Sequence, residues 1–148
     1  MMMVLMGVIS FLGGVLNTVQ SGSNATLAKT LHQPILAALI VTAVNGCAYL
    51  ALAPFIGLHW PKAAAFVEVP WWAWLGGAFG GTYVLASIFF AEKLGGGIFI
   101  GLTVTAGVIT SITMDHYGLV GFKPHPVNWP RFVGGALMIF GVTLVGLN

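Results

Sequence analysis

Charge is what this sequence has least of. Asp, Glu, Lys and Arg together make up 5% of its 148 residues, whereas 58% of the residues are hydrophobic. In a soluble domain about a quarter of the residues or more are charged, which keeps the surface in water. This shortage excludes a soluble globular protein, and we expect lipid to surround most of the chain.

Positive charge is also too sparse for nucleic-acid binding. Five Lys and Arg residues stand against three acidic residues, which gives a formal net charge of +2. The sequence lacks the clustered basic patch that nucleic acids require. The one cysteine, Cys47, lies in an apolar run and has no disulfide partner within the chain. We therefore expect no nucleic-acid partner and a packing role for Cys47.

The side chains that an enzyme needs are missing as well. Ser87 and Ser111 have no histidine predicted at the same depth to activate them. The four histidines show no metal-ligand spacing on one helix face. Gly95-Gly96-Gly97 lacks the lysine and hydroxyl of a phosphate-binding loop. We expect no catalytic activity, no metal and no cofactor.

Long apolar runs are what the sequence does contain. About 20 residues in a helix cross the ~30 Å hydrocarbon core of a bilayer, and five runs approach that length, at about 3–20, 35–58, 71–91, 98–114 and 131–147. The sequence therefore predicts an all-α integral membrane protein with five transmembrane helices in one domain, residues 1–148, located in the cell (inner) membrane.

The breaks between the runs are polar or rich in Gly and Pro. The first run closes in the polar stretch at residues 20–24, and we expect a loop there that contains Lys29 and His32 and ends at Pro34. Residues 59–70 read as a partly amphipathic linker at the membrane interface. Residues 95–97 predict a tight turn that makes the third and fourth runs a hairpin.

Three tryptophans open the third run. Trp71, Trp72 and Trp74 are typical of an interfacial aromatic belt, because indole combines an apolar ring with a polar N–H. An aromatic substrate box is the alternative, and Trp74, the deepest of the three, fits either interpretation.

Five spans place the two termini on opposite sides of the membrane. Lys62, Lys123 and Arg131 then share one side with the N-terminus, whereas Lys29 and Lys93 lie on the other. This small bias permits dual topology. Two copies in opposite orientations form an inverted repeat, the arrangement that many transporters use to build a site at the bilayer midplane.

Glycines at helical spacing predict close helix packing, because small residues let membrane helices approach each other. The candidates for packing are Gly76, Gly77, Gly80, Gly81, Gly97 and Gly101.

Polar residues within the spans predict either a substrate path or hydrogen bonds that hold the bundle together. In the first run, Asn17, Ser21 and Asn24 recur three and four residues apart and share one face. Polar groups facing lipid are costly, so they point to other helices or to a water-filled cavity. The candidates for the path are Asn17, Gln20, Ser21, Asn24, Asn45, Trp74, Tyr83 and Thr103.

No charged residue lies at the middle of a predicted span. A proton-coupled exporter of cations ordinarily carries a carboxylate at membrane depth, so the substrate is expected to be neutral, zwitterionic or held by carboxamides and helix ends. Asp115 and His116 are candidates for coupling or gating near the membrane edge. The alternative is a helix end solvated at the interface.

A set of residues spread over the whole chain adds a family likeness. It comprises Gln20 with Asn24 and Leu27, Pro34, Gly76-Gly77 with Gly80, Tyr83-Val84, Leu94-Gly95, Asp115-His116-Tyr117-Gly118, and Arg131, Gly134, Leu137-Met138 and Gly141. In order and spacing this set resembles the YdcZ-like family of the drug/metabolite transporter superfamily, described as small inner-membrane exporters. Residues 115–118 are the most specific part.

The resemblance implies a five-helix unit equivalent to half of a ten-helix inverted-repeat fold, acting as a homodimer or as a heterodimer with a paralogue. One position departs from the family pattern, in which a glutamine often follows the glycine of the fourth span: here Val108 follows Gly107. If that carboxamide contacts substrate in relatives, this chain differs in specificity or relies on Asn17 and Asn45.

Together these features predict a secondary transporter that exports a small metabolite or drug-like compound by alternating access as an antiparallel dimer. Two alternatives are a passive channel, which an uncharged lining permits, and an accessory subunit that packs through its glycines. If the chain is an accessory subunit, substituting Gly80 should impair its function more than substituting Gln20 or Asn24.

Overall fold

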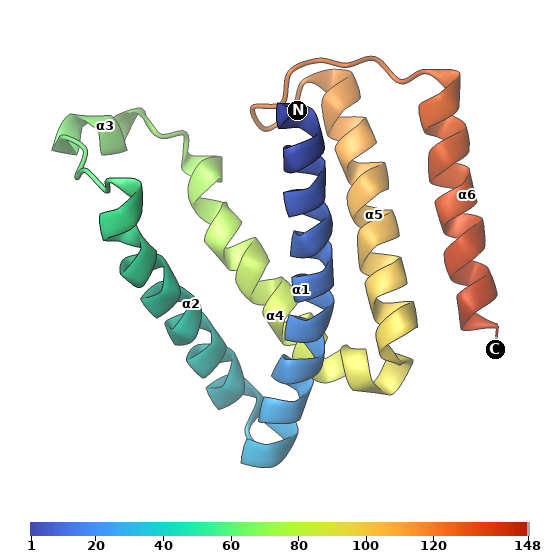
Figure 1. Cartoon of the computed structure of the whole chain (residues 1–148), viewed down its shortest axis with the longest axis horizontal. Helices are drawn as coiled ribbons and strands as arrows, with labels where there is room; N and C mark the ends of the chain where they lie inside the picture. The colour runs from blue at the N-terminus through green and yellow to red at the C-terminus, as the bar shows by residue number, and fades with distance from the viewer. Residues whose placement is uncertain (148) are drawn as a thin grey trace. The chain divides into compact units, whose positions relative to one another are not determined.

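The computed structural model describes residues 1–147, and they are almost entirely helical (Figure 1). The elements in chain order are α1 (Met2–Leu31), α2 (Pro34–Ile56), α3 (Ala63–Glu68), the 3-10 helix η1 (Trp71–Trp74), α4 (Leu75–Leu94), α5 (Gly96–Tyr117) and α6 (Trp129–Gly146). Within this described part, five helices are long and apolar enough to cross a bilayer, η1 and α4 counting together as one span. The predicted all-α membrane fold is confirmed.

The end of the first helix was predicted wrongly. The polar stretch at residues 20–24 does not break the helix, which continues to Leu31 and so includes Lys29. Hydroxyl groups in and just after this stretch bond back to their own helix, since Ser21 donates to the Asn17 backbone carbonyl at 3.0 Å and Thr26 to the Gly22 carbonyl at 2.9 Å. Hydroxyl groups that bond in this way do not replace the backbone hydrogen bonds of the helix.

The backbone conformation of residues 32–34 ends α1 at Leu31. His32 adopts a left-handed conformation with φ 53°, and its N–H bonds to the Lys29 carbonyl. Gln33 precedes Pro34, and a residue before proline is pushed out of the helical region. Proline then opens α2, where its fixed φ suits the first turn of a helix.

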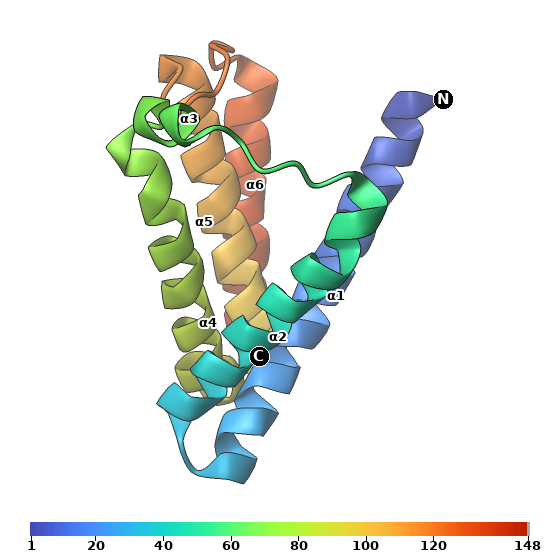
Figure 2. The same cartoon turned by 90° about the vertical axis from the view of Figure 1, so that its left-hand side faces the viewer.

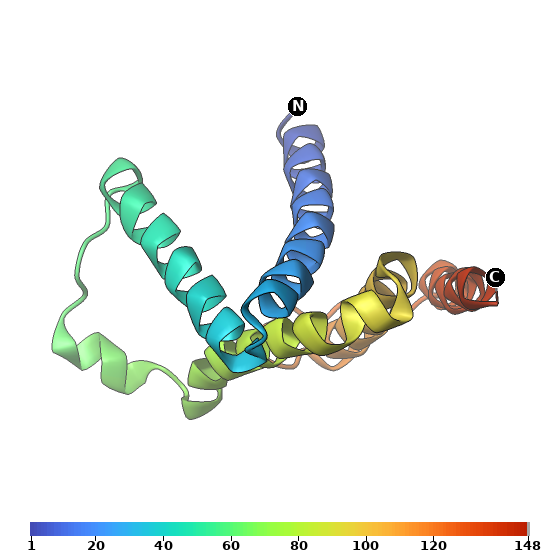
Figure 3. The ribbon, with the colours of Figure 1, turned by 90° about the horizontal axis from the view of Figure 1, so that it is seen from below.

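The chain forms two compact units, one up to Glu92 and the other from Lys93 onward. In the first unit, α1 and α2 leave the turn at residues 32–33 and diverge (Figure 3). An extended stretch then joins α2 to the short helix α3 (Figure 2). A small core forms where three helices meet, from Ala28 of α1, Ala37 of α2, and Val84 and Ile88 of α4.

The second unit is a hairpin of α5 and α6, which lie side by side (Figure 1). Gly101 permits this close approach, because a Cβ built there would lie 2.9 Å from Cγ2 of Val142. Gly118 ends α5 with φ 62°, a left-handed conformation in which glycine is the natural residue. A Cβ there would also lie 2.9 Å from Cγ of Pro124 in the connecting loop.

Most large apolar side chains remain exposed in both units. Phe11 of α1, Phe55 of α2 and Phe140 of α6, for example, are 73%, 87% and 62% exposed. In water such surfaces would drive aggregation, whereas hydrocarbon solvates them. The five apolar spans and the unburied surface therefore belong to one multi-pass membrane protein.

Candidate functional site

A row of uncharged polar side chains joins α1 to α4 in the first unit. Asn17 Nδ2 donates to the Tyr83 hydroxyl at 3.0 Å, and Ser21 Oγ lies 3.1 Å from the same hydroxyl. Ser21 uses its own proton on the Asn17 carbonyl, so Tyr83 must be the donor to Ser21. The result is a closed ring of hydrogen bonds around one phenol group.

A second connection lies one turn further along both helices. Asn24 Nδ2 donates to Ser87 Oγ at 3.0 Å, and Ser87 donates onward to the Val84 carbonyl at 2.7 Å. Asn24 is 3% exposed and Ser87 is fully buried. We call the five residues Asn17, Ser21, Asn24, Tyr83 and Ser87 the polar ladder. It can hold a hydrogen-bonding partner, but it presents no charge.

An ion pair stands near the same ends of the two helices. Lys29 Nζ lies 2.6 Å from Glu92 Oε1, and the two side chains are 71% and 58% exposed. Lys29 follows Asn24 by five residues and Glu92 follows Ser87 by five. Charged groups are therefore kept to the exposed helix ends, and the ladder itself remains uncharged.

The second unit carries a separate polar cluster where α5 ends and α6 begins. Arg131 Nη2 lies 3.1 Å from Asp115 Oδ2, and its Nη1 donates to the His125 carbonyl at 3.4 Å. The Val127 N–H donates to Nδ1 of His116 at 3.1 Å, which requires that nitrogen to be unprotonated. We call Asp115, His116, His125 and Arg131 the clasp, because they tie the loop to both helix ends.

The other predicted path residues are not joined to the ladder. Gln20 and Asn45 are half-buried, and their carboxamides have no hydrogen-bond partner within residues 1–147. Trp74 is 59% exposed and stacks on Phe66 with ring centroids 6.3 Å apart. Thr103 belongs to the second unit and donates to the Ile100 carbonyl at 3.0 Å.

The predicted packing glycines differ in their surroundings. A Cβ at Gly97 would lie 3.6 Å from Val145, and Gly101 is tighter still. Those two face α6 within the second unit. At Gly76, Gly77, Gly80 and Gly81, in contrast, an added Cβ would meet no atom of the described chain within 4 Å. These four glycines of α4 leave a face open to lipid or to another protein.

Comparison with known proteins adds one decisive match. A family model described as "Putative inner membrane exporter, YdcZ" matches residues 5–144. The chain belongs to this family. No curated protein and no solved structure matches it.

Membership of the YdcZ family confirms the resemblance drawn from the sequence and the location in the inner membrane. The family description is that of an exporter, and all of the ladder lies inside the matched range. The match extends to the clasp as well, since Asp115 and Arg131 also fall between residues 5 and 144.

Sequence reasoning missed several contacts of the site in this YdcZ-family chain. Ser87 was weighed as a nucleophile without a base and was not among the candidates for the path, although it bonds to Asn24. The pairing of Glu92 with Lys29, 63 residues apart in sequence, was not predicted either. Matching periodicity was the available signal, because Tyr83 and Ser87 are spaced four apart like Asn17 and Ser21.

The two ion pairs should respond differently to the loss of one partner. Arg131→Met leaves the Asp115 side chain, 17% exposed, without its cation, and we expect this to destabilise the protein by about 1–2 kcal/mol. Lys29→Met breaks a well-solvated pair and should change stability little. Apparent melting temperatures in detergent would compare the two variants. Equal losses of stability would show that side-chain exposure does not determine how much each ion pair contributes.

Proposed function

We propose that this YdcZ-family protein is a secondary transporter, which exports a small neutral or zwitterionic compound by alternating access. The observation that carries the proposal is the polar ladder. Its five side chains offer carboxamide and hydroxyl groups between two membrane helices, where polar groups facing lipid are expensive. A substrate that replaces these mutual bonds with its own would find complementary donors and acceptors.

The strength of the ladder suits a cycle of opening and closing. Hydrogen bonds between membrane helices contribute about 0.6 kcal/mol each on average. Three such bonds between α1 and α4 therefore hold the helices together without locking them. Because Asn24 and Ser87 are buried, separating the helices would expose groups that then need a new partner. Substrate can supply that partner.

The absence of charge from the ladder supports the substrate class. An unpaired cation or anion in a low-dielectric site needs an opposite charge, and the described ladder has none. The charged groups Lys29 and Glu92 are exposed at the helix ends. A neutral or zwitterionic compound with several hydrogen-bonding groups fits such a lining better than a lone cation does.

The transporting unit in this proposal is an antiparallel dimer, formed with a second copy or with a paralogue. A chain with five spans supplies one half of an inverted repeat. The open glycine face of α4, at Gly76 and Gly80, supports a close helix contact with the second half. Asp115 and His116 act in this scheme as gating residues, since they fasten the loop at one end of the hairpin.

A passive channel is the second candidate, and the uncharged ladder is the observation that favours it. Proteoliposomes would separate the two candidates. A transporter should show counterflow, in which unlabelled compound inside drives saturable uptake of labelled compound from outside. A panel of labelled polyols, amides and amino acids, with cationic dyes for comparison, would also test the substrate class.

Orientation in the native membrane tests the dimer directly. Single cysteines would be placed at Gln33, in the turn between α1 and α2, and at Val127, before α6, after Cys47→Ala. We expect a membrane-impermeant maleimide to label each site from both sides, because an antiparallel homodimer inserts both ways. Labelling from one side only would contradict the homodimer and leave the heterodimer with a paralogue to be tested.

A further inference from the structure

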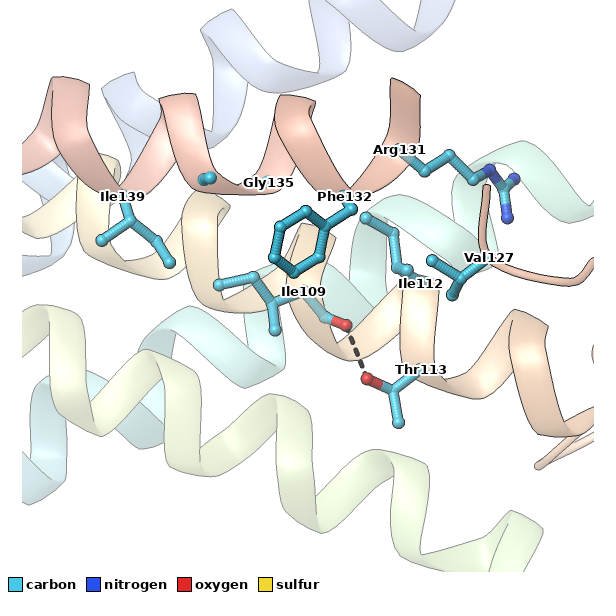
Figure 4. Close-up of a pocket in the computed structure, with 9 residues that line it drawn as sticks. Ile109, Ile112, Thr113, Val127, Arg131, Phe132, Gly135 and Ile139 are labelled. Atoms are coloured by element: carbon cyan, nitrogen blue, oxygen red, sulfur yellow. Dashed lines mark hydrogen bonds between the residues drawn. The ribbon is translucent and has the colours of Figure 1, made fainter. Parts of the chain in front are cut away.

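The second unit contains an apolar groove between α5 and α6 (Figure 4). Its volume is about 330 Å³. Ile109 and Ile112 form the α5 wall, and Phe132 and Ile139 form the α6 wall. Gly135 has no side chain to fill the space between them. The Thr113 hydroxyl at the groove donates to the Ile109 carbonyl at 2.9 Å. Its proton is therefore already used, and a bound molecule need not accept a hydrogen bond from it.

One end of the groove is charged. Arg131 lines the groove where α6 begins, and it also lines an adjoining hollow of about 510 Å³ together with Asp115 and Ser111. The guanidinium and the Asp115 carboxylate are 3.1 Å apart, with side chains 36% and 17% exposed. Arg131, which the groove and the hollow share, therefore presents a cation at the groove mouth, and the Asp115 anion lies beside it in the hollow.

The groove runs for most of the depth of one bilayer leaflet, which is half of a ~30 Å hydrocarbon core. From Arg131 to Ile139 the groove follows α6 for eight residues, or about 12 Å of helix. Trp129, 74% exposed and stacked on Phe132 at 5.6 Å, marks the interface at the charged end. The charged mouth thus lies at headgroup level and the apolar end within the hydrocarbon.

We propose that the groove binds a phospholipid whose head carries a phosphate and a primary ammonium. The acyl chain lies along Ile109, Phe132 and Ile139. The phosphate pairs with Arg131, which can form charge-assisted bonds to phosphate oxygens, and the ammonium pairs with Asp115. Charge complementarity selects this head, because an anionic lipid would meet the Asp115 carboxylate as well as the cation. The site does not depend on which compound the protein exports, although it shares Asp115 with the proposed gate.

Lipid retention after purification tests the proposal. The full-length protein would be extracted from vesicles of equal phosphatidylethanolamine and phosphatidylglycerol, and bound lipid measured by native mass spectrometry. We expect phosphatidylethanolamine to exceed phosphatidylglycerol severalfold. Asp115→Asn should reverse the preference towards phosphatidylglycerol, because Arg131 loses its counter-charge, and Arg131→Gln should lower retention of both lipids. Glu92→Gln, an acid of the other ion pair, should leave the ratio unchanged.

Filling the groove provides a second measurement. Gly135→Leu places a side chain in the space, and its Cβ would meet Ile112 Cδ1 only at 4.0 Å. Gly141→Leu on the same helix is the matched control, since a Cβ there meets no other atom within 4 Å in the described part of the chain. Retention should fall for Gly135→Leu alone.

Three results would overturn the lipid assignment. The first is equal retention of both lipids by the parent protein, and the second is an unchanged ratio in Asp115→Asn. The third is a changed oligomeric state with unchanged lipid in Gly135→Leu, which would make the groove an interface between copies. If Gly135→Leu fails to fold, the lipid ratio measured for Asp115→Asn decides whether the lipid assignment stands.

Discussion

Tyr83→Phe is expected to lower export by roughly tenfold while the protein keeps its helices and its membrane orientation. The change removes one oxygen, which accepts from Asn17 and donates to Ser21. Two bonds of about 0.6–1 kcal/mol each are lost, and ~1.4 kcal/mol corresponds to a factor of ten. Counterflow in proteoliposomes would measure the effect, with a neutral or zwitterionic compound that the parent protein carries.

Tyr49→Phe is the matched control for this experiment. Tyr49 lies on α2 and is 72% exposed, so the same chemical change there should leave export unaltered. Circular dichroism and apparent melting temperature would show whether either variant has lost structure. Full export by Tyr83→Phe would mean that the ladder only holds the helices together, and the proposed path would have to be abandoned.

Gly101→Ile is expected to destabilise the second unit by about 3 kcal/mol, towards the upper end of the cost of overpacking. The new Cβ would lie 2.9 Å from Cγ2 of Val142. Valine has one preferred side-chain rotamer in a helix, so the contact can be relieved only by moving α5 and α6 apart. The apparent melting temperature in detergent should fall by many degrees.

Gly107→Ile tests whether the effect comes from the contact and not from the side chain itself. Gly107 lies on the same helix, and an added Cβ there meets no atom of residues 1–147 within 4 Å. Isoleucine also has a better helix propensity than glycine, so this variant should be at least as stable as the parent. Comparable losses in both variants would contradict the packing assigned to Gly101.

The spans could be predicted from the sequence because lipid imposes a minimum length of apolar helix. Glycine and proline marked most ends correctly, as at Gly95 and Pro34. The polar stretch at residues 20–24 gave the wrong end for α1. Ser21 in this stretch and Thr26 just after it bond to their own helix, and nothing in their hydropathy distinguishes that arrangement from a loop.

The functional residues were only partly predictable, for a related reason. Periodicity on one helix shows that Asn17, Ser21 and Asn24 share a face, and the structure places these side chains against α4. Periodicity does not reveal which helix that face meets. The partners Tyr83 and Ser87 lie more than 60 residues away in sequence, and so does Glu92 from Lys29. Pairings of that range depend on tertiary structure.

The length of α1 has a consequence for the membrane itself. Its 30 residues extend about 45 Å, against a hydrocarbon core of ~30 Å. Such a helix must tilt or project into the headgroups. Asn17 lies 12 residues before Lys29, about 18 Å along the axis. Bilayer thickness therefore sets the depth in the membrane at which Asn17 meets Tyr83. Lipids of different chain length would change the depth of the ladder without contacting its residues.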